Sequence, residues 1–166
     1  MGPFSHFVSY QWNFFYYASW CLAYEGEDYP QYLPLNLPKK TMATDDMEHY
    51  SINSSTSDAE WAPLFPDGGG FVFLGPQNRP FGVSMFHQFH CLEDLWHAMV
   101  ARKRSQHTTH CLAYLRQMIL CRGDLRIEPL IPPYPLKQVD STANRTCQDW
   151  SLVYRALEQN HSHVKV

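Results

Sequence analysis

The stretch HQFHCL at residues 87–92 and the stretch HTTHCL at residues 107–112 carry the same motif, HxxHC, 20 residues apart. On an α-helix, the offsets 0, +3 and +4 share one face, because each residue advances by about 100°. Each copy is therefore expected to present two imidazoles and one sulfur on one side of a helix, which is half of a metal site. A lone histidine on an apolar helix is usually a core residue, but two copies with one spacing favour metal binding.

Apolar residues near helical spacing surround both motifs. Ser84 is expected to cap a first helix that runs to His97 or beyond. Thr108 or Thr109 is expected to cap a second helix that runs to Cys121. Both motifs are thus predicted to lie on helices.

A continuous helix through both motifs would separate them by about 30 Å, at about 1.5 Å per residue. A plain antiparallel hairpin is expected to fail as well, because it sets His107 beside His97. For all four motif histidines to converge, the first helix must stop near His97 or Ala98, and the chain up to Gln106 must return alongside it. Gly123 is expected to end the second helix.

The chain before the first motif is rich in turn residues. Residues 25–66 are expected to form loops and short helices, since prolines and a polar run interrupt them. The run Asp67–Gly70 predicts a turn, and Phe71–Leu74 predicts a short strand. No Lys-Ser or Lys-Thr follows the glycines, so a phosphate-binding loop is excluded.

After the second motif, residues 125–130 are a candidate strand and residues 131–135, with three prolines, are expected to be an extended loop. Thr146 and Asp149 resemble the capping box of a last helix that runs to about Gln159. The fold class expected is α+β: a helix-dominated, loop-rich single domain with a small β element, in which the two HxxHC helices pack together and are clamped by disulfides.

Composition narrows the function further. The chain has 166 residues, a formal net charge of -3 and a pI near 6.3, which argues against a nucleic-acid partner. Hydrophobic residues make up 45% and charged residues 17%, which excludes a disordered chain. Aromatic residues reach 15%, so rings are expected to supply much of the packing.

Residues 4–24 are apolar and aromatic, but polar residues interrupt them, and no basic residue precedes Lys39. No clear transmembrane helix or signal peptide is therefore expected. The segment is interpreted as an arm that packs on the domain or on its twin, with contact to a membrane surface as the alternative. We expect residues 1–57 to form this arm and a turn-rich segment, and residues 58–166 to form the compact catalytic region.

The five cysteines are Cys21, Cys91, Cys111, Cys121 and Cys147. Cys111 and Cys121 are about 15 Å apart on one helix and cannot bond. If the last four all pair, Cys91 joins either Cys111 or Cys121, and Cys147 joins the remaining one. The pairing of Cys91 with Cys111 is preferred, because it clamps the two motifs face to face.

The ligand types alone leave the metal open. Imidazoles suit zinc, copper, iron or nickel. Thiolates at Cys91 and Cys111 would favour zinc or cuprous copper, whereas a disulfide there would favour an all-histidine copper site.

Five stretches resemble a known family, the UstYa-like proteins of fungal secondary metabolism. They are EWAPLFP at 60–66, GGFV at 69–72, HQFHCLEDLW at 87–96, HTTHCLAYLRQMILCRGDLRIEP at 107–129 and CQDW at 147–150. The resemblance implies an enzyme that tailors a peptide or small metabolite by oxidative cyclisation, hydroxylation, desaturation or halogenation. Copper is the metal it implies, although some relatives are thought to close rings without oxidation.

The resemblance covers about residues 58–155, and the doubled HxxHC motif is its most specific part. The family usually carries an N-terminal transmembrane helix, where this chain has the short aromatic stretch 4–24. Many members have a histidine two residues before the cysteine that corresponds to Cys147, where this chain has Arg145.

The first hypothesis is a copper-dependent oxidative tailoring enzyme in which His87, His90, His107 and His110 hold one or two copper ions, with O2 or peroxide as the oxidant. Candidate pocket residues are Trp61, Phe86, Tyr114 and Trp150, and Tyr114 is also a candidate proton or electron donor. Core packing is the alternative role for these rings. Glu93 and Asp94 are candidate acceptors for imidazole N–H groups, with solvated helix charges as the alternative.

Two rival hypotheses belong to other classes. A non-oxidative cyclase, without metal or with a Lewis acid, would use the same histidines as acids, bases or hydrogen-bond donors. A zinc-stabilised binding module would close all four ligands around one ion and catalyse nothing. Metal analysis would separate the three hypotheses. Bound copper favours the oxidative enzyme, absence of metal favours the cyclase, and one tightly held zinc ion favours the binding module.

Three glycosylation sequons, at Asn53, Asn144 and Asn160, and the cysteines favour the secretory lumen (ER or Golgi) or secretion. The partner expected is a small-molecule or peptide substrate, together with a second subunit in a homo- or heterodimer.

Overall fold

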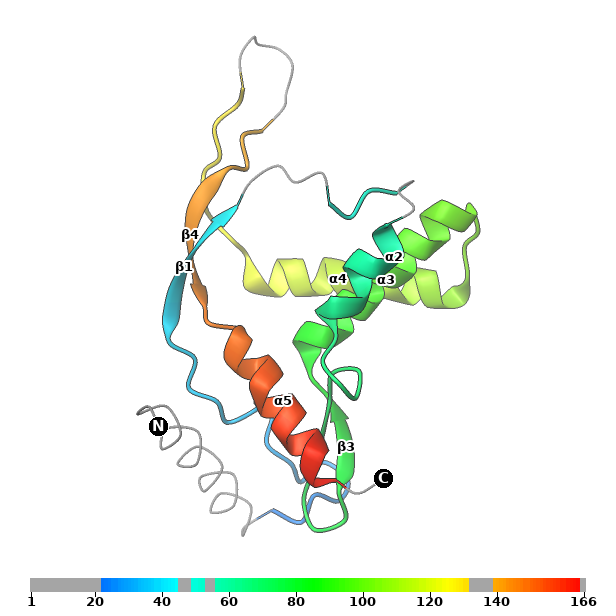
Figure 1. Ribbon diagram of the computed structural model, residues 1–166, viewed down its shortest axis with the longest axis vertical. Helices are drawn as coiled ribbons and strands as arrows, with labels where there is room; N and C mark the ends of the chain where they lie inside the picture. The colour runs from blue at the N-terminus through cyan, green and yellow to red at the C-terminus, as the bar shows by residue number, and fades with distance from the viewer. Residues whose placement is uncertain (1–21, 45–48, 53–55, 132–138, 165–166) are drawn as a thin grey trace. The chain divides into compact units, whose positions relative to one another are not determined.

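The computed structural model describes residues 22–44, 49–52, 56–131 and 139–164 (Figure 1). It divides into two compact units. Of the described residues, the first unit comprises 22–38, 66–83 and 149–164, and the second comprises those within 39–65 and 84–148. Both HxxHC motifs belong to the second unit.

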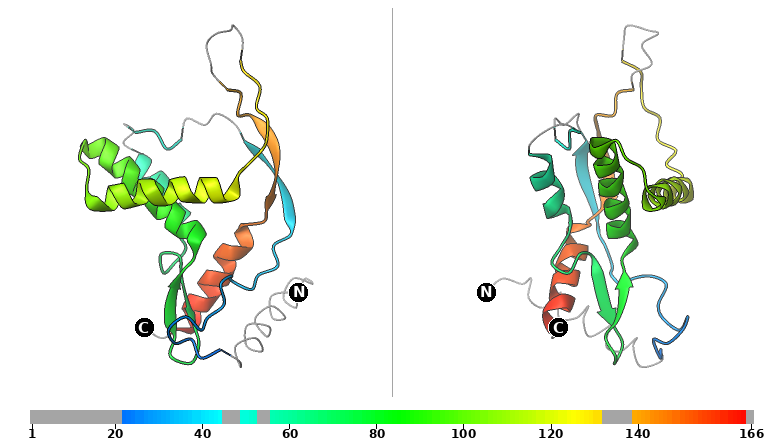
Figure 2. Two further views of the ribbon diagram at one scale, coloured as in Figure 1. Left: turned by 180° about the vertical axis from the view of Figure 1, so that it is seen from behind. Right: turned by 90° about the vertical axis from the view of Figure 1, so that its right-hand side faces the viewer.

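The first unit is built from a hairpin and a helix. Strands β2 (Phe71–Leu74) and β3 (Arg79–Gly82) pair antiparallel, with Phe71 opposite Gly82. Helix α5 (Ser151–His163) lies beside this hairpin (Figure 2). Their apolar faces share a core that consists of Val72, Leu74, Val153, Ala156 and Leu157, all buried. The strand predicted at residues 71–74 is confirmed.

A buried amide fixes α5 to β2. The Phe73 backbone N–H donates to Oδ1 of Asn160 over 2.7 Å, and Nδ2 of Asn160 donates to the Phe73 carbonyl over 2.8 Å. Asn160 is only 7% exposed. A buried polar group costs little when it is fully paired, so this bridge holds the two elements in register.

The second unit contains a two-stranded ribbon. Strands β1 (Lys39–Thr44) and β4 (Ala143–Gln148) pair antiparallel, with Lys39 opposite Gln148 and Thr44 opposite Ala143. The ribbon shows that the expectation of only loops and short helices over residues 25–66 was wrong. Lys39–Thr44 extends because a partner strand about 100 residues later supplies its hydrogen bonds, and local turn signals do not report such a partner.

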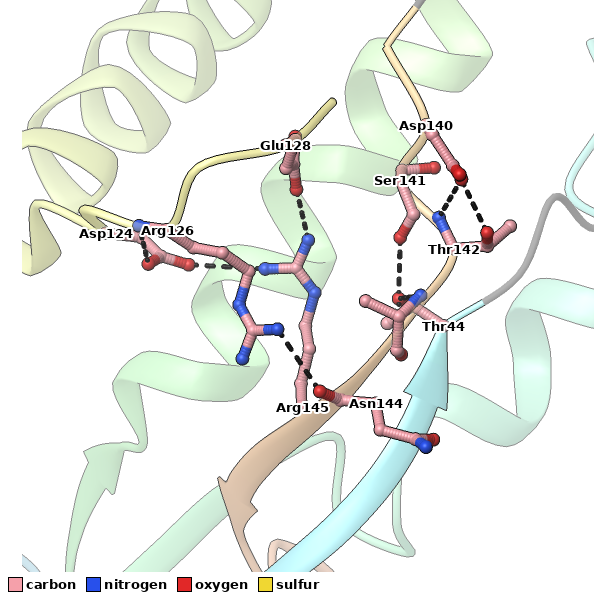
Figure 3. Close-up of polar contacts among 10 residues, drawn as sticks. Thr44, Asp124, Arg126, Glu128, Asp140, Ser141, Thr142, Asn144 and Arg145 are labelled. Atoms are coloured by element: carbon pink, nitrogen blue, oxygen red, sulfur yellow. Dashed lines mark hydrogen bonds and ion pairs between the residues drawn. The ribbon is translucent and has the colours of Figure 1, made fainter. Parts of the chain in front are cut away.

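An arginine ties β4 to the segment after the second motif helix (Figure 3). Arg145 forms ion pairs with Asp124, at 3.3 Å, and with Glu128. Arg126 donates in turn to the carbonyl of Asn144 over 3.1 Å. These contacts hold residues 124–128 in an extended path against the ribbon.

Helices α2 (Ser57–Trp61) and η2 (Ala62–Leu64) precede the motif helices. The rings of Trp61 and Trp96 lie 6.0 Å apart, and both residues are buried. Nε1 of Trp96 donates to the Ser51 carbonyl over 3.2 Å, and the Ser57 hydroxyl donates to the same oxygen. Aromatic rings thus form much of this core, as the composition predicts.

The two motif helices are α3 (Ser84–Ala101) and α4 (Gln106–Arg122), which pack against each other. Helix α3 ends in a Schellman-type turn, with Lys103 N–H bonded to the Ala98 carbonyl and Arg102 in the left-handed region at φ 50°. This turn reverses the chain at once.

The prediction that α3 must stop near His97 or Ala98 was therefore wrong. The helix continues to Ala101, and residues 102–105 make the return before α4 begins at Gln106, with Ser105 in an extended conformation. The histidines still meet, because the chain returns alongside the end of α3 as expected: His107 lies beside Asp94 and His90 rather than beside His97. A short linker can make this return, because extended chain covers about 3.3 Å per residue whereas a helix rises only about 1.5 Å per residue.

The ends of α4 follow local sequence rules. Ser105 is the N-cap: its hydroxyl accepts from Thr108 N–H over 3.0 Å, and the Thr108 hydroxyl accepts from Ser105 N–H. The cap expected at Thr108 or Thr109 thus lies three or four residues earlier, because Thr108 fills the reciprocal position of the capping box. Gly123 is the C-cap, at φ 49°, as predicted.

Two further predictions about the C-terminal half were wrong. Residues 125–130 form no strand; only an isolated bridge joins Leu130 to Val139. Thr146 does not cap the last helix, because it pairs with Thr41 in the ribbon, and Trp150 is the N-cap of α5. The proline run at 132–135 lies outside the described residues.

The fold class is α+β, helix-rich and with small antiparallel sheets, as expected. The division into residues 1–57 and 58–166 stays a prediction, because residues 1–21 lie outside the described ranges. Within the described ranges, no helix has the length and apolar content needed to cross a bilayer.

Candidate metal centre

All four motif histidines meet between α3 and α4. The Nε2 atoms of His90 and His107 lie 3.3 Å apart, and the rings of His87 and His110 lie 5.8 Å apart. Each of these contacts joins one helix to the other. The convergence expected from the repeated spacing is confirmed.

Two groups of three side chains have ligand atoms close enough to bind one ion. His87, Cys91 and His110 form one group, and Asp94, His107 and Cys111 form the other. Within each group, the ligand atoms lie within 4.8 Å of one another. Each group draws on both helices, so neither motif forms a site alone.

Asp94 orients His107. Oδ1 of Asp94 lies 3.0 Å from Nδ1 of His107. A carboxylate only accepts hydrogen bonds, so in the neutral ring Nδ1 carries the proton and Nε2 keeps its lone pair. That lone pair faces Nε2 of His90, at 3.3 Å, and Sγ of Cys111, at 3.6 Å. Of the two candidate roles for Asp94, the imidazole acceptor is thus confirmed.

Tyr114 covers His87 on the other side of the site. The two rings stack with centroids 4.1 Å apart and planes at 27°. The phenol of Tyr114 shares a hydrogen bond of 2.9 Å with the hydroxyl of Ser84. The first turn of α3 thus positions the ring that packs on the first motif histidine.

The motif cysteines form the floor of the site. Cys91 and Cys111 are both 0% exposed, whereas His90, His107 and His110 are exposed. Burial, followed by a hydrogen bond with Cys91, raises the pKa of the Cys111 thiol to about 12. The centre therefore has a buried sulfur floor and an imidazole rim open to solvent.

The four described cysteines, Cys91, Cys111, Cys121 and Cys147, are free thiols in the structure, so the clamp between α3 and α4 is not covalent there. Contact between Cys91 and Cys111 agrees with the preferred pairing, which stays a prediction. Cys21 lies outside the described residues.

Electrostatics at the site favour neutral imidazole beside an anionic carboxylate. Burial lowers the pKa of His87, and the neighbouring imidazoles of His110, His90 and His107 lower it further. Burial raises the pKa of Asp94, but the hydrogen bond with His107 and the nearby Thr108 side chain outweigh it, so the net pKa lies below the ordinary value. Metal ions require ligands in these protonation states.

An orphaned atom supports the fit of a cation. Oδ2 of Asp94 is buried and accepts no hydrogen bond within the described part of the chain. Unpaired buried oxygens are rare in folded proteins, and an ion or water usually accounts for them. With imidazole nitrogens and sulfur beside it, the donor set suits copper or zinc.

The remaining predicted site residues lie elsewhere. Trp61 and Phe86 are 5% and 2% exposed, so both are core residues, as the alternative reading held. Trp150 is 44% exposed, stacks edge-on against Tyr154, and belongs to the first unit. Tyr114 is the pocket candidate that contacts the histidines.

The glycosylation candidates differ among themselves. Asn160 was a wrong candidate for the folded chain, because it is buried and both its amide atoms bind Phe73. Asn144 is exposed in β4 and stays a prediction. Asn53 lies outside the described residues.

The sequence predicted only a capping role for Ser84, and for Asp94 it left open whether the carboxylate accepts from an imidazole or is a solvated helix charge. Asp94 and Tyr114 stand at the same place, seven residues after the first histidine of each motif. Seven residues are nearly two full helical turns, so both fall on the histidine face. The spacing of seven residues after the first histidine of each motif could therefore have indicated that Asp94 and Tyr114 lie at the site.

The fold and these side chains define a class of protein: a pair of HxxHC helices that carries a candidate transition-metal centre. The family model described as mycotoxin biosynthesis protein UstYa matches residues 36–155. The chain therefore belongs to the UstYa family.

Relatives from two fungi are similar to this chain over part of their length. The oxidase ustYa of Aspergillus flavus is 30% identical over 139 residues, which cover 68% of this chain and 64% of that protein. The oxidase ustYb of the same species is 24% identical over an alignment of 170 positions. That alignment covers 72% of this chain and 65% of that protein. The UstYa family oxidase phomYb of Diaporthe leptostromiformis is 26% identical over 121 residues, which cover 59% and 48%.

The chain thus spans between about half and two thirds of the length of these relatives. No solved structure matches the chain.

Proposed function

We propose that this chain is a copper-dependent oxidase of natural-product biosynthesis, which tailors a peptide or small metabolite by oxidative cyclisation, hydroxylation, desaturation or halogenation. The observation that carries the proposal is the meeting of four imidazoles from two helices around a buried pair of sulfurs. Relatives named as oxidases support the oxidative chemistry. Four imidazoles with sulfur form a donor set that binds copper well.

Copper, when bound, supplies one-electron chemistry that amino-acid side chains lack. His87, His90, His107 and His110 would hold it. Three of these imidazoles are exposed, so a substrate in solvent reaches the rim without a rearrangement of the helices. The buried cysteine floor keeps water out from below.

Two neighbours of the histidines have distinct roles in the proposal. Asp94 holds the Nδ1 proton of His107 and so presents the Nε2 lone pair. The phenolic oxygen of Tyr114 lies 2.9 Å from the Ser84 Oγ atom, and its ring packs on His87. The phenol can therefore exchange a proton with a substrate at the rim through Ser84, which is itself exposed.

The compartment we propose is the secretory lumen. Support comes from the exposed sequon at Asn144 and from a pair of adjacent motif cysteines that could be oxidised there. A dimer and the substrate class remain parts of the same proposal.

The test uses the biosynthetic intermediate that accumulates when this chain is deleted from its source organism. Purified chain is incubated with that intermediate, with copper or after exhaustive chelation, in air or without oxygen. We expect turnover only with copper and an oxidant. Undiminished turnover after chelation and without oxygen would contradict the oxidase and support a non-oxidative cyclase that uses the histidines as acids, bases or hydrogen-bond donors.

A further inference from the structure

The contacts that the α3 histidines make with α4 are matched by the contacts that the α4 histidines make with α3. Each residue of the first motif corresponds to the residue 20 positions later, so that His87 matches His107 and His90 matches His110. The contact of His87 with His110, at 5.8 Å between rings, then corresponds to that of His107 with His90, at 5.0 Å. The centre consequently has an approximate local two-fold relationship.

The same exchange relates two residues outside the motifs. Asp94 contacts His107 through a hydrogen bond of 3.0 Å, and Tyr114, 20 residues later, contacts His87 through a ring stack of 4.1 Å. Both contacts join one helix to the first histidine of the motif on the other helix. At this one pair of equivalent positions, the two halves of the centre carry a carboxylate and a phenol.

The chemical difference between these two groups is large. A carboxylate adds a full negative charge beside an ion and fixes which nitrogen of His107 holds the lone pair. A phenol stacked on His87 leaves the charge of its half unchanged, and its hydroxyl is bonded to Ser84 instead. Only the Asp94 half, moreover, contains a buried oxygen with no hydrogen-bond partner in the described chain.

On the basis of the proposed function, we propose that Asp94 makes the two halves unequal toward a divalent transition-metal cation. The half formed by Asp94, His107 and Cys111 binds an ion first, and the half formed by His87, Cys91 and His110 binds a second ion more weakly. Asp94 acts as a positioning residue for His107: its Oδ1 holds the Nδ1 proton, so that the Nε2 lone pair is presented to the ion.

The experiment titrates cobalt(II) alone into the reduced, metal-free chain of residues 1–166 without oxygen, so that no catalysis is involved. Calorimetry gives the number of ions and the affinity of each step, and the near-ultraviolet thiolate-to-cobalt absorption reports on sulfur ligation. The variants are Asp94→Asn, Asp94→Glu and Tyr114→Phe. Glu93→Gln, which changes the adjacent carboxylate of α3, is the matched control. Circular dichroism confirms that each metal-free variant is folded.

We expect two steps of different affinity in the unchanged chain. Asp94→Asn should weaken the first step by about 10- to 100-fold, the usual cost of losing a carboxylate behind a histidine ligand. The second step should be unchanged, Asp94→Glu should recover part of the loss, and Tyr114→Phe and Glu93→Gln should leave the first step unchanged.

Three results would overturn the inference: a single ion shared by all four histidines, two steps that Asp94→Asn weakens equally, or no effect of Asp94→Asn at all. None of them bears on oxidation, which the turnover assay with copper and oxygen tests separately. Conversely, turnover that resists chelation would contradict the proposed oxidase function. That result would leave the inference about two unequal cobalt steps intact.

Discussion

Asp94 on α3 and Nδ1 of His107 on α4 lie 3.0 Å apart, although 13 residues and a chain reversal separate them. The side chain of Asp94 is 24% exposed and that of His107 is 46% exposed. The pair therefore combines partial burial with access to the rim. It also fixes which part of α3 the second motif faces, and so determines which histidines can share a ligand.

The cysteine floor predicts unequal thiol reactivity in the reduced chain. Cys121 is exposed and should react with iodoacetamide at neutral pH, while the buried Cys91 and Cys111 stay unmodified. Burial and a pKa of about 12 keep the Cys111 thiol protonated, and the thiolate is the reactive form. Peptide mass mapping after timed alkylation measures each site. Equal rates at Cys111 and Cys121 in folded protein would disprove the buried floor.

The bridge from Asn160 to Phe73 predicts a stability cost in the first unit. Asn160→Ala should lower the free energy of unfolding by about 1–3 kcal/mol, because two buried backbone groups lose their partners. Denaturant unfolding followed by circular dichroism gives the value. Glu158→Ala, at an exposed position of α5, is the control and should change it by less than about 0.5 kcal/mol. No glycan should be found on Asn160 in folded protein that is expressed through a secretory pathway.

Trp61 should behave as a core residue. Trp61→Ala should lower the free energy of unfolding by about 3–5 kcal/mol, as expected when a buried tryptophan leaves a cavity. Trp61→Phe should recover part of that loss and leave metal content unchanged. If Trp61→Phe instead abolished turnover at full metal content, the original reading of Trp61 as a pocket residue would be restored.

The lowered pKa of His87 predicts a pH dependence of stability in the metal-free chain. Its pKa lies near 6.5 when unfolded and lower when folded, so between the two values the unfolded state binds more protons. The free energy of unfolding should then fall as the pH drops below about 6.5, its ordinary value. Urea unfolding between pH 8 and pH 5 measures the slope. His87→Gln should reduce the slope, whereas the exposed His97→Gln should leave it unchanged.

Much of the site could be predicted from spacing alone. Helical periodicity places residues at offsets 0, +3 and +4 on one face whatever the tertiary structure, so the shared face of the two histidines and the cysteine in each motif followed from the repeat. Asp94 and Tyr114 lie on the same face, but their roles depend on which helix contacts which, and that depends on the turn at Arg102.

The remainder depended on partners that are distant in sequence. The strand Lys39–Thr44 forms only because Ala143–Gln148 pairs with it, and the same pairing removes Thr146 from the cap of α5. The turn after Ala101 uses Arg102 in the left-handed region, where the usual signal is glycine. Local signals at these positions were either absent or pointed to a competing structure.

The most direct test of the central claim is the copper content of purified chain, with the electron paramagnetic resonance spectrum of Cu²⁺, in the unchanged protein and in His90→Ala and His110→Ala. We expect bound copper with nitrogen couplings in the unchanged chain. Each histidine variant should bind less copper than the unchanged chain and lose turnover with it, because each removes a ligand that the opposite helix cannot replace. Folding should persist in both, since His90 and His110 are exposed, and His163→Ala should match the unchanged chain. Unaltered copper content in both variants would contradict the account.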